Sequence, residues 1–292
     1  DRNNERSHLI MGFVDLLKER AKKSIKTIVL PETEDMRTLE ATDKILKEGV
    51  AKIILIGNEE EINKKAAEGG FDISGATIVD PETSDRTQAY IDKFVELRAK
   101  KGMTPEKAKE ILHTQYPYYG VMMVKMGDAD GMVSGACHST ADTLRPCLQI
   151  LKTKPGTKLV SAFFLIVVPD CEYGANGAFV FADSGLNQNP TPEELSAIAA
   201  SSAESFQLLV EEEPIVAMLS HSTKGSAKHP EVEATRIAKE EHPELKLDGE
   251  FQLDAAIVPS VGASKAPGSE VAGKANVLVF PDLDAGNIGY KL

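Results

Sequence analysis

A chain of 292 residues can bury a large core, and this length favours two compact domains over one. Its formal net charge of −12 would repel a polyphosphate backbone, and only 5% of its residues are aromatic, so a nucleic-acid partner is not expected. Its longest apolar run, residues 162–168, is too short to span a bilayer, which argues against a membrane protein.

The three cysteines are widely and irregularly spaced, and no two of them form a C-x-x-C pair. This pattern indicates neither a disulfide framework nor a zinc site. The chain also opens without the basic and apolar segments of a secretory leader. Together these features predict a cytoplasmic protein.

The first half of the sequence alternates between strand and helix periods. Short apolar runs predict buried strands at 27–30, 52–56 and 76–79, and apolar residues at helical spacing predict helices at 13–21, 36–46 and 59–68. The run at 53–56 is apolar at every position, which is typical of parallel strands covered on both faces. Repeated strand–helix units with short connections predict a doubly wound α/β sheet.

Three more helices are predicted at 84–100, 104–112 and 118–126, and a short strand follows at 130–133. A loop of small residues at 134–140 then leads into a helix at 141–151. Pro155 and Gly156 break this pattern. We therefore place a domain boundary there, which divides the chain into a first α/β domain at 1–155 and a second α/β domain at 156–292.

The second domain begins with a different local pattern. Residues 161–168 and 178–181 predict two strands joined by a turn-rich segment, and hence antiparallel pairing. A long helix follows from Thr191, where Pro192 and Glu194 have the spacing of a capping box.

Further buried strands are predicted at 215–219, 255–258 and 277–280, so the expected fold class is α/β with a mainly parallel sheet and some antiparallel strands. Residues 284–292 read as a loop that is just entering a helix. Because a helix needs several turns of apolar face to dock, we expect residues beyond Leu292 to complete the first domain.

Four polar loops follow predicted strands. Open α/β sheets bind their ligands at the carboxyl ends of strands, so these loops together indicate an enzyme that handles a small phosphorylated or carboxylated anion. The four loops are residues 134–140, 220–228, 263–269 and 281–287, and each contains small, hydroxyl-bearing, glycine or lysine residues.

The loop at 134–140 precedes a helix, so its N–H groups and hydroxyls are predicted to bind an anion at a positive helix terminus. Arg145 lies one turn further on and could reach the same anion. The alternative is that Ser139 or Thr140 simply caps the helix.

The second loop, residues 220–228, contains Ser222 and Lys224. It suits phosphate recognition but lacks the glycine spacing of a Walker loop, and the alternative is a solvated turn.

Four other residues are considered and set aside. His138 is interpreted as a hydrogen-bonding loop residue rather than a base, since no acidic residue adjoins it in the sequence. Cys137 is interpreted as a small filler rather than a nucleophile, because no histidine–carboxylate pair is suggested beside it. Asp282 and Asp284 are not interpreted as metal ligands, because no third carboxylate or histidine lies nearby.

Longer strings in the sequence resemble the phosphate acetyl/butyryltransferase family, and phosphate acetyltransferase (phosphotransacetylase) in particular, from about Met11 to Leu292. They are SGACHSTADTLRP (134–146), PDCEYG (169–174), FADSG (181–185), STKGSAK (222–228), LDGEFQLDAA (247–256), SKAPGS (264–269) and FPDLDAGN (280–287).

The resemblance implies a two-domain α/β/α fold of the isocitrate/isopropylmalate dehydrogenase type, usually in a homodimer, with the active site in the interdomain cleft. The implied reaction is the reversible transfer of an acetyl group between acetyl phosphate and coenzyme A, with coenzyme A as a substrate and no metal or other cofactor. The family's catalytic serine, arginine and aspartate would fall after Leu292, so no catalytic residue is assigned.

The resemblance also implies binding roles for individual residues. Arg98 matches a family arginine associated with coenzyme A. Residues expected on the substrate and phosphate side are Arg145, Ser134, Ser139, Thr140, Ser222, Thr223, Lys224, Gly225, Lys265 and Asn287.

Three alternative functions stay open at this point. A phosphate butyryltransferase would differ in the volume of its acyl pocket. A non-catalytic acetyl-CoA-sensing module, like the one fused to some malic enzymes, would follow a malic-enzyme domain. A dehydrogenase of the same fold would need a metal-binding aspartate cluster and a nicotinamide site, and the sequence suggests neither.

Overall fold

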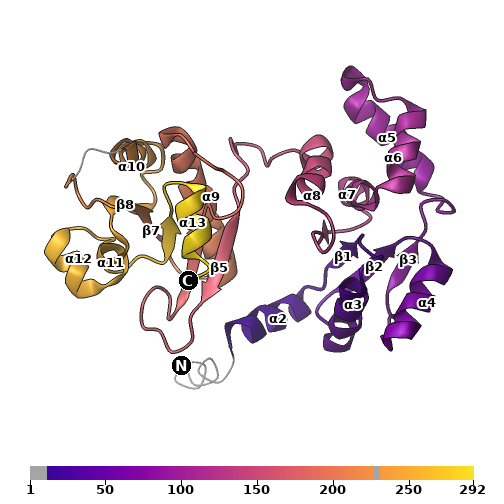
Figure 1. The fold of residues 1–292 in the computed structure, drawn as a ribbon, viewed down its shortest axis with the longest axis horizontal. Coiled ribbons are helices and arrows are strands. Elements are labelled where there is room, and N and C mark those ends of the chain that lie inside the picture. Colours follow the sequence, from indigo (N-terminus) through magenta and orange to yellow (C-terminus); the bar gives the residue numbers. More distant parts are fainter. Residues whose placement is uncertain (1–11, 227–229) are drawn as a thin grey trace. The chain divides into compact units, whose positions relative to one another are not determined.

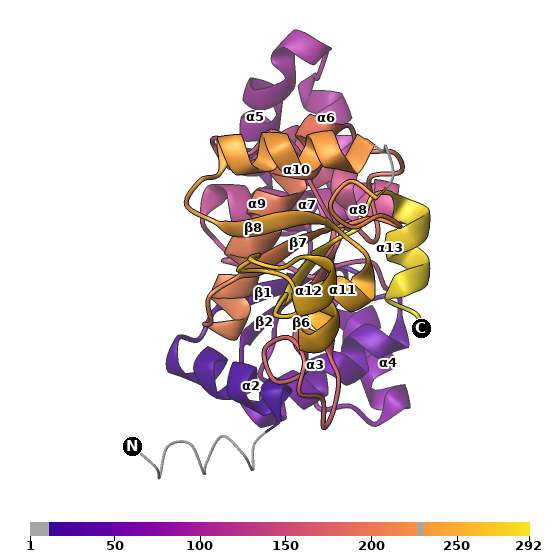
Figure 2. The ribbon, with the colours of Figure 1, turned by 90° about the vertical axis from the view of Figure 1, so that its left-hand side faces the viewer.

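The computed structural model describes residues 12–226 and 230–292. The chain divides into two compact units, Asp1–Lys152 and Thr153–Leu292, whose elements are drawn in Figures 1 and 2. Pro155 and Gly156, where the sequence suggested a boundary, lie just inside the second unit. Each unit has its own sheet and its own core, and each is described by itself.

The first unit contains a four-stranded sheet and seven described α-helices. The strands are β1 (Thr27–Leu30), β2 (Lys52–Ile56), β3 (Thr77–Val79) and β4 (Gly131–Met132). The α-helices are α2 (Phe13–Lys23), α3 (Met36–Glu48), α4 (Glu59–Gly69), α5 (Thr87–Arg98), α6 (Pro105–Thr114), α7 (Tyr116–Met126) and α8 (Thr140–Pro146). Short 3₁₀ and π-helical turns, η1 (Ala99–Lys101) and η2 (Cys147–Leu151), extend α5 and α8.

All four strands of this sheet are parallel, in the order β3-β2-β1-β4. Side chains of β2 alternate between its faces: Ile54 and Ile56 pack with α5–α7, and Ile53 and Leu55 pack with α3 and α4 (Figure 1). The apolar run at 53–56 is therefore buried on both faces, as its composition predicted. The chain leaves β1 and β4 at the same edge, where their carboxyl ends lie side by side.

The second unit contains a five-stranded sheet and five described α-helices. The strands are β5 (Phe163–Val167), β6 (Ala178–Ala182), β7 (Ile215–Leu219), β8 (Lys246–Phe251) and β9 (Val277–Val279). The helices are α9 (Pro192–Val210), α10 (Pro230–Glu241), α11 (Leu253–Ile257), α12 (Pro259–Lys265) and α13 (Leu283–Gly289).

The strand order of this second sheet is β5-β6-β9-β7-β8. Strand β5 runs antiparallel to β6, as expected, and the other neighbours are parallel. Helices α9 and α10 cover one face, while α11 and the segment that follows α12 belong to the core on the other face (Figure 2). The α/β fold class, mainly parallel with an antiparallel strand, is thus confirmed.

Side chains at the starts of two helices in the second unit form N-terminal caps. Thr191 and Glu194 form the predicted capping box at the start of α9, in which each side chain bonds to the other residue's N–H. Asp282 caps α13 by accepting the N–H of Ala285 at 2.8 Å, which gives this carboxylate a structural role.

Some predicted elements were wrong. Residues 255–258 are not a strand, because 253–257 form α11; a short apolar run alone cannot distinguish the two. Strand β8 was missed, since Asp248 and Glu250 interrupt its apolar pattern. The loop at 263–269 begins inside α12, and the loop at 281–287 enters α13 at Leu283.

No helix in the described ranges is both long and apolar enough to cross a membrane. The three cysteines, Cys137, Cys147 and Cys171, are free thiols in this structure.

A pair of substitutions on α9 tests how this helix docks. Phe206 is 0% exposed in the core of the second unit, whereas Leu208, two residues later, is 70% exposed. We expect Phe206→Ala to destabilise the protein by about 3–5 kcal/mol, because it leaves a cavity, and Leu208→Ala to change stability by about 0.5 kcal/mol or less. Denaturant unfolding of both variants measures this; equal losses would contradict the orientation of α9.

Candidate functional site

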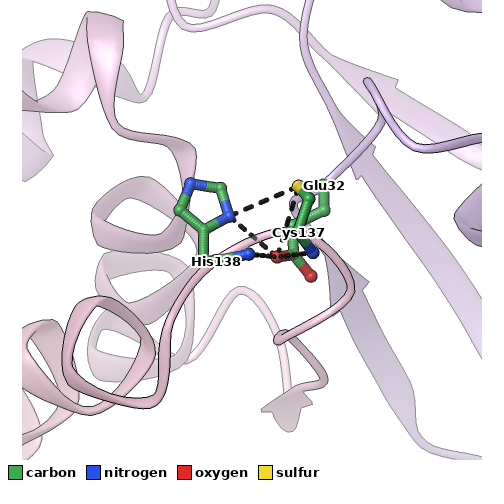
Figure 3. Close-up of side chains that lie close together, drawn as sticks. All are labelled: Glu32, Cys137 and His138. Carbon is green, nitrogen blue, oxygen red and sulfur yellow. Dashed lines mark hydrogen bonds and ion pairs between the residues drawn. The ribbon is translucent and has the colours of Figure 1, made fainter.

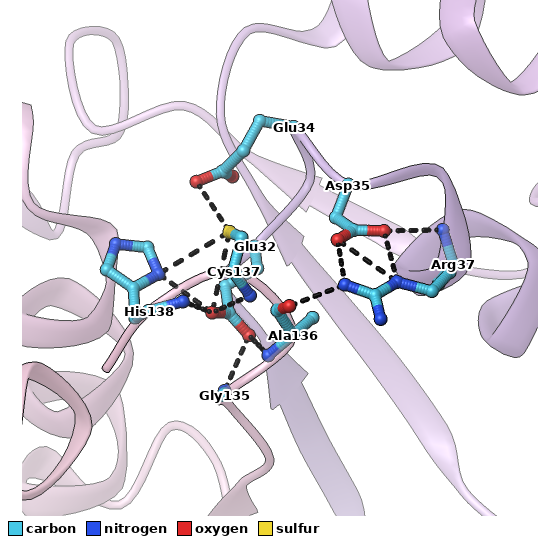
Figure 4. A network of polar contacts seen from close by, with 8 residues as sticks. All are labelled: Glu32, Glu34, Asp35, Arg37, Gly135, Ala136, Cys137 and His138. Atoms are coloured by element: carbon cyan, nitrogen blue, oxygen red, sulfur yellow. Dashed lines mark hydrogen bonds and ion pairs between the residues drawn. The ribbon is translucent and has the colours of Figure 1, made fainter. Parts of the chain in front are cut away.

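The first candidate site lies at the carboxyl edge of the sheet in the first unit, around the side chain of Glu32. This residue is 2% exposed and stands two positions after β1. One of its carboxylate oxygens accepts the N–H groups of Gly135 and Ala136 at 2.7 and 2.8 Å, and the other accepts those of Cys137 and His138, both at 3.0 Å (Figure 4). The loop at 134–140 does bind an anion through its backbone, but that anion is the protein's own carboxylate.

The hydrogen bonds strongly stabilise the charged form of Glu32. Burial alone favours the neutral acid, but the N–H groups of Cys137 and Ala136, the His138 side chain and the N–H of Gly135 outweigh it and lower the pKa of Glu32 to about 2. Glu32 is therefore ionised at neutral pH and ties the loop after β4 to the end of β1.

His138 has an acidic partner that the sequence did not reveal. Its Nδ1 lies 2.7 Å from a carboxylate oxygen of Glu32, 106 residues earlier in the chain (Figure 3). His138 is thus a hydrogen-bonding loop residue, as the sequence analysis interpreted it, but the reason given there, the lack of an acidic neighbour, does not hold in the fold. The contact has the geometry of a carboxylate that orients an imidazole, and it leaves Nε2 facing away from Glu32.

The Cys137 thiol lies between acidic groups. Its Sγ is 3.3 Å from a carboxylate oxygen of Glu34 and 3.6 Å from both Glu32 and the Nδ1 of His138. Burial and the two carboxylates raise the pKa of Cys137 to about 12. The thiol is thus protonated at neutral pH, which disfavours Cys137 as a nucleophile.

Helix α8 begins directly after this loop. Ser139 is its N-cap and accepts the N–H of Asp142 at 3.1 Å, and Thr140 is the first helical residue. Arg145 points outward with 51% of its side chain exposed and forms an ion pair of 2.9 Å with Asp142. Ser139 therefore has the capping role that was the alternative to anion binding, while the guanidinium of Arg145 stays accessible on the surface of the unit.

Arg145 and Arg98 approach the same tyrosine. Burial raises the pKa of the Tyr118 hydroxyl, and the positive charges of Arg145 and Arg98 both oppose that rise. Among the described residues, the Nε of Arg98 and the Oγ of Ser134 are buried without a hydrogen-bond partner. Two arginines that are 47 positions apart in the sequence thus both influence the pKa of Tyr118.

The second candidate site lies in the second unit, in the loop after β7. Ser222 is fully buried, and its hydroxyl donates to a carboxylate oxygen of Glu250 at 3.0 Å. The N–H of Gly225 donates to the same oxygen at 2.6 Å. Thr223 accepts the N–H of Gln252 through its hydroxyl at 2.9 Å. The described part of this loop therefore closes over a buried carboxylate too; Lys228, its last predicted residue, lies outside the described residues.

Two lysines of the second unit converge on Asp248 in β8. The Nζ atoms of Lys224 and Lys239 lie 2.5 and 2.8 Å from one carboxylate oxygen, and Ser269 donates to the other oxygen at 2.6 Å. Burial opposes ionisation of Asp248, but these donors outweigh it and lower its pKa to about 2.

A cavity of about 360 Å³ opens beside this group, with Lys224, Asp248, Lys265 and Ser269 in its wall. Lys265 also donates to Gln252 and pairs with Asp254, both at 2.9 Å. The wall of this cavity thus carries two ammonium groups beside the apolar side chains of Ala266 and Pro267.

Asn287 lies on α13, close to the turn after β6. Its amide donates to the carbonyl of Ser184 at 3.2 Å. Gly286 beside it packs so tightly that a Cβ would lie 2.2 Å from the carbonyl oxygen of Asp183. Asn287 is therefore part of the contact that docks α13.

Sequence reasoning missed the carboxylates on which both sites depend. Glu32 offered one usable signal, since it directly follows a predicted parallel strand. Asp248 and Glu250 offered none, because the strand that contains them was not predicted. The loop at 263–269 was also expected to follow a strand, and it follows α12 instead.

Comparisons with known proteins give a consistent result. A family model described as "Phosphate acetyl/butaryl transferase" matches residues 12–292. The chain is 57% identical to the phosphate acetyltransferase of Acetivibrio thermocellus, over 97% of this chain and 85% of that protein. It is 48% identical to the phosphate acetyltransferase of Bacillus subtilis, over 96% and 85%.

A solved structure agrees with these relatives. The crystal structure of a phosphotransacetylase from Streptococcus pyogenes is similar with a TM-score of 0.87 at 45% identity, and the match covers 96% of this chain and 84% of that one.

The Glu32 contacts predict a specific acid response. The pKa of Glu32 falls from an ordinary 4.5 to about 2 on folding, so ionised Glu32 contributes about 3 kcal/mol to the free energy of unfolding. This contribution is fully present above about pH 5 and is lost as the pH falls towards 2. Glu32→Gln should lower the melting temperature at pH 7. The gap between variant and wild type should shrink steadily between pH 5 and 2. Thermal melts across this range test it, and a gap independent of pH would contradict the assignment.

Proposed function

Since this chain belongs to the phosphate acetyl/butyryltransferase family, we propose that it is a phosphate acetyltransferase, which transfers an acetyl group reversibly between acetyl phosphate and coenzyme A. The observation that carries this conclusion is the agreement of close relatives: proteins of that name match nearly the whole chain, through both units, at about half identity or better. The enzyme is thus an acyltransferase.

The reaction places three demands on the protein. The coenzyme A thiol must lose its proton, so that its sulfur can attack the acetyl carbonyl carbon. The carbonyl oxygen becomes an oxyanion that needs fixed hydrogen-bond donors. The C–S bond forms together with this oxyanion. When the oxyanion collapses, the C–O bond to phosphate breaks, and the departing phosphate, which keeps the electron pair of that bond, needs cations. Such a direct transfer requires no covalent enzyme intermediate, and it is consistent with the protonated state of Cys137.

In the first unit we propose that Arg145 binds the phosphate end of the substrate. Its only described ion-pair partner is the half-exposed Asp142, so a doubly charged phosphate could replace that partner at little cost. The hydroxyls of Ser134 and Thr140 are proposed as neighbouring donors, with Ser139 as the cap that positions the helix. Arg98, whose charge like that of Arg145 opposes the rise in the pKa of Tyr118, is proposed to contact coenzyme A.

In the second unit the proposed phosphate-binding residues divide into two groups. Lys224 and Lys265 are the better candidates for direct contact, because both ammonium groups line the 360 Å³ cavity. Ser222, Thr223 and Gly225 bond to groups of the protein itself and are proposed to hold Lys224 in place. Asn287 is likewise proposed as a supporting residue through the docking of α13.

We further propose that coenzyme A enters as a substrate and that acetyl transfer needs no metal or organic cofactor, since attack by a thiol on an acyl phosphate requires neither redox chemistry nor an electron sink. A cytoplasmic homodimer is proposed from the family resemblance. Light scattering of the purified protein tests the dimer.

The activity itself is tested on the natural full-length protein. We expect thioester formation from acetyl phosphate and coenzyme A, followed at the ultraviolet absorption of the thioester, and a clear preference for acetyl over butyryl phosphate in kcat/KM. A preference for butyryl phosphate would favour the phosphate butyryltransferase alternative. Binding of acetyl-CoA without turnover would favour a sensing module.

The role of Arg145 is tested by substitution. We expect Arg145→Ala to lower kcat/KM for acetyl phosphate by about 10- to 150-fold, the equivalent of about 1.5–3 kcal/mol for a lost charge-assisted contact. Arg145→Lys should recover only part of this, since an ammonium lacks the planar fork. The control is Arg236→Ala, a half-exposed arginine of α10 that pairs with Glu233 and Glu240 and should retain wild-type kinetics. Unchanged kinetics in Arg145→Ala would refute the assignment.

A further inference from the structure

Three different kinds of metal-binding side chain meet at the carboxyl edge of the first unit's sheet. A carboxylate oxygen of Glu32, the Sγ of Cys137 and the Nδ1 of His138 all lie within 4.8 Å of one another (Figure 3). The Sγ is 3.6 Å from each of the other two atoms, and the oxygen and nitrogen are 2.7 Å apart. Among the described residues, no other group of three such side chains is this compact.

These separations suit one ion. Zinc binds sulfur at about 2.3 Å and histidine nitrogen or carboxylate oxygen at about 2.1 Å. For a triangle with sides of 3.6, 3.6 and 2.7 Å, a point about 1 Å outside its plane satisfies all three bond lengths, and the imidazole and the carboxylate then need to move apart by about 0.7 Å to reach a tetrahedral angle. One face of the ion then stays open for a fourth ligand. The carboxylate of Glu34, 3.3 Å from the Sγ, can supply it (Figure 4).

The surroundings suit a cation in three further respects. Glu32 and Glu34 supply two negative charges, while the nearby guanidinium of Arg37 is held by Asp35 and the carbonyl of Ala136. Four backbone N–H groups hold the Glu32 carboxylate, so one ligand is positioned in advance. Cys137 is exposed, and Glu34 and His138 line a cavity of about 280 Å³, so an ion has a path of entry.

We propose that Glu32, Cys137 and His138 form a binding site for a borderline-soft divalent cation such as Zn²⁺, with Glu34 or water as the fourth ligand. A thiolate and an imidazole select Zn²⁺ or Co²⁺ over Mg²⁺ and Ca²⁺, which prefer oxygen ligands. On binding, the ion takes the place of the Cys137 thiol proton, which passes to solvent, and His138 binds through Nδ1 as the neutral imidazole with its proton on Nε2. The site is additional to acetyl transfer and does not depend on it.

The bound ion would reinforce a contact that the fold already makes. It would link the segment after β1 to the loop after β4 through side chains, where Glu32 now links them through backbone N–H groups. We therefore expect the ion to stabilise the first unit, because it binds the folded form in preference to the unfolded one.

The test is a titration of the full-length, metal-free protein with Co²⁺. A near-ultraviolet thiolate-to-cobalt charge-transfer band should grow to one equivalent, disappear on addition of Zn²⁺ and persist in excess Mg²⁺. Cys137→Ser should abolish the band, and His138→Gln should weaken Co²⁺ binding about tenfold or more. Cys171→Ser, in the other unit, is the matched control and should behave as wild type.

Two outcomes would overturn the proposal. One is the absence of any thiolate–cobalt band in the wild-type protein while its melting curve shows a folded chain. The other is a band that survives in Cys137→Ser and is lost in Cys171→Ser, which would place the ion elsewhere. A rise in the wild-type melting temperature with Zn²⁺, absent in the folded Cys137→Ser variant, would give independent support.

Discussion

A single buried carboxylate connects the end of β1 to the loop after its neighbour β4, and through that loop to helix α8. Glu32 stands at the end of β1 and accepts four consecutive backbone N–H groups of the loop after β4. These four contacts replace hydrogen bonds to water with bonds to one fixed, charged acceptor, and charge-assisted hydrogen bonds are stronger than neutral ones. The direction of the loop, the start of α8 at Thr140 and the position of Arg145 one turn later all follow from this contact.

The same solution recurs in the second unit, where Glu250 accepts the Ser222 hydroxyl and the Gly225 N–H. Loops rich in small residues and hydroxyls are suited to anions in general, and a carboxylate from the chain satisfies them as well as a phosphate does. The groups that remain for a substrate phosphate are therefore long cationic side chains, above all Arg145 in the first unit and Lys265 in the second. Their charges are balanced by half-exposed carboxylates, which a doubly charged phosphate can displace.

Cys137 and His138 show how one cluster can support opposite chemistries. Without a cation, the neighbouring carboxylates keep the Cys137 thiol protonated and thus unreactive as a nucleophile. A divalent cation in the same position would reverse this effect, because its charge stabilises a coordinating thiolate. Direct attack by the coenzyme A thiol and a cation at Glu32 are compatible, since neither uses Cys137 as a nucleophile.

Much of the fold followed from local patterns. The strands at 27–30 and 52–56, the cap at Thr191 and the α/β class depend on periodicity and on residues a few positions apart, so the sequence alone determined them. The family membership likewise came from contiguous strings of residues.

The partner of His138 was decided only by the tertiary structure, because Glu32 lies 106 residues away and meets it only when β4 pairs with β1. The same holds for β8, whose acidic residues look unsuited to a buried strand until Lys224 and Ser222 are folded against them. Charge compensation between distant segments leaves no periodic signal in a sequence.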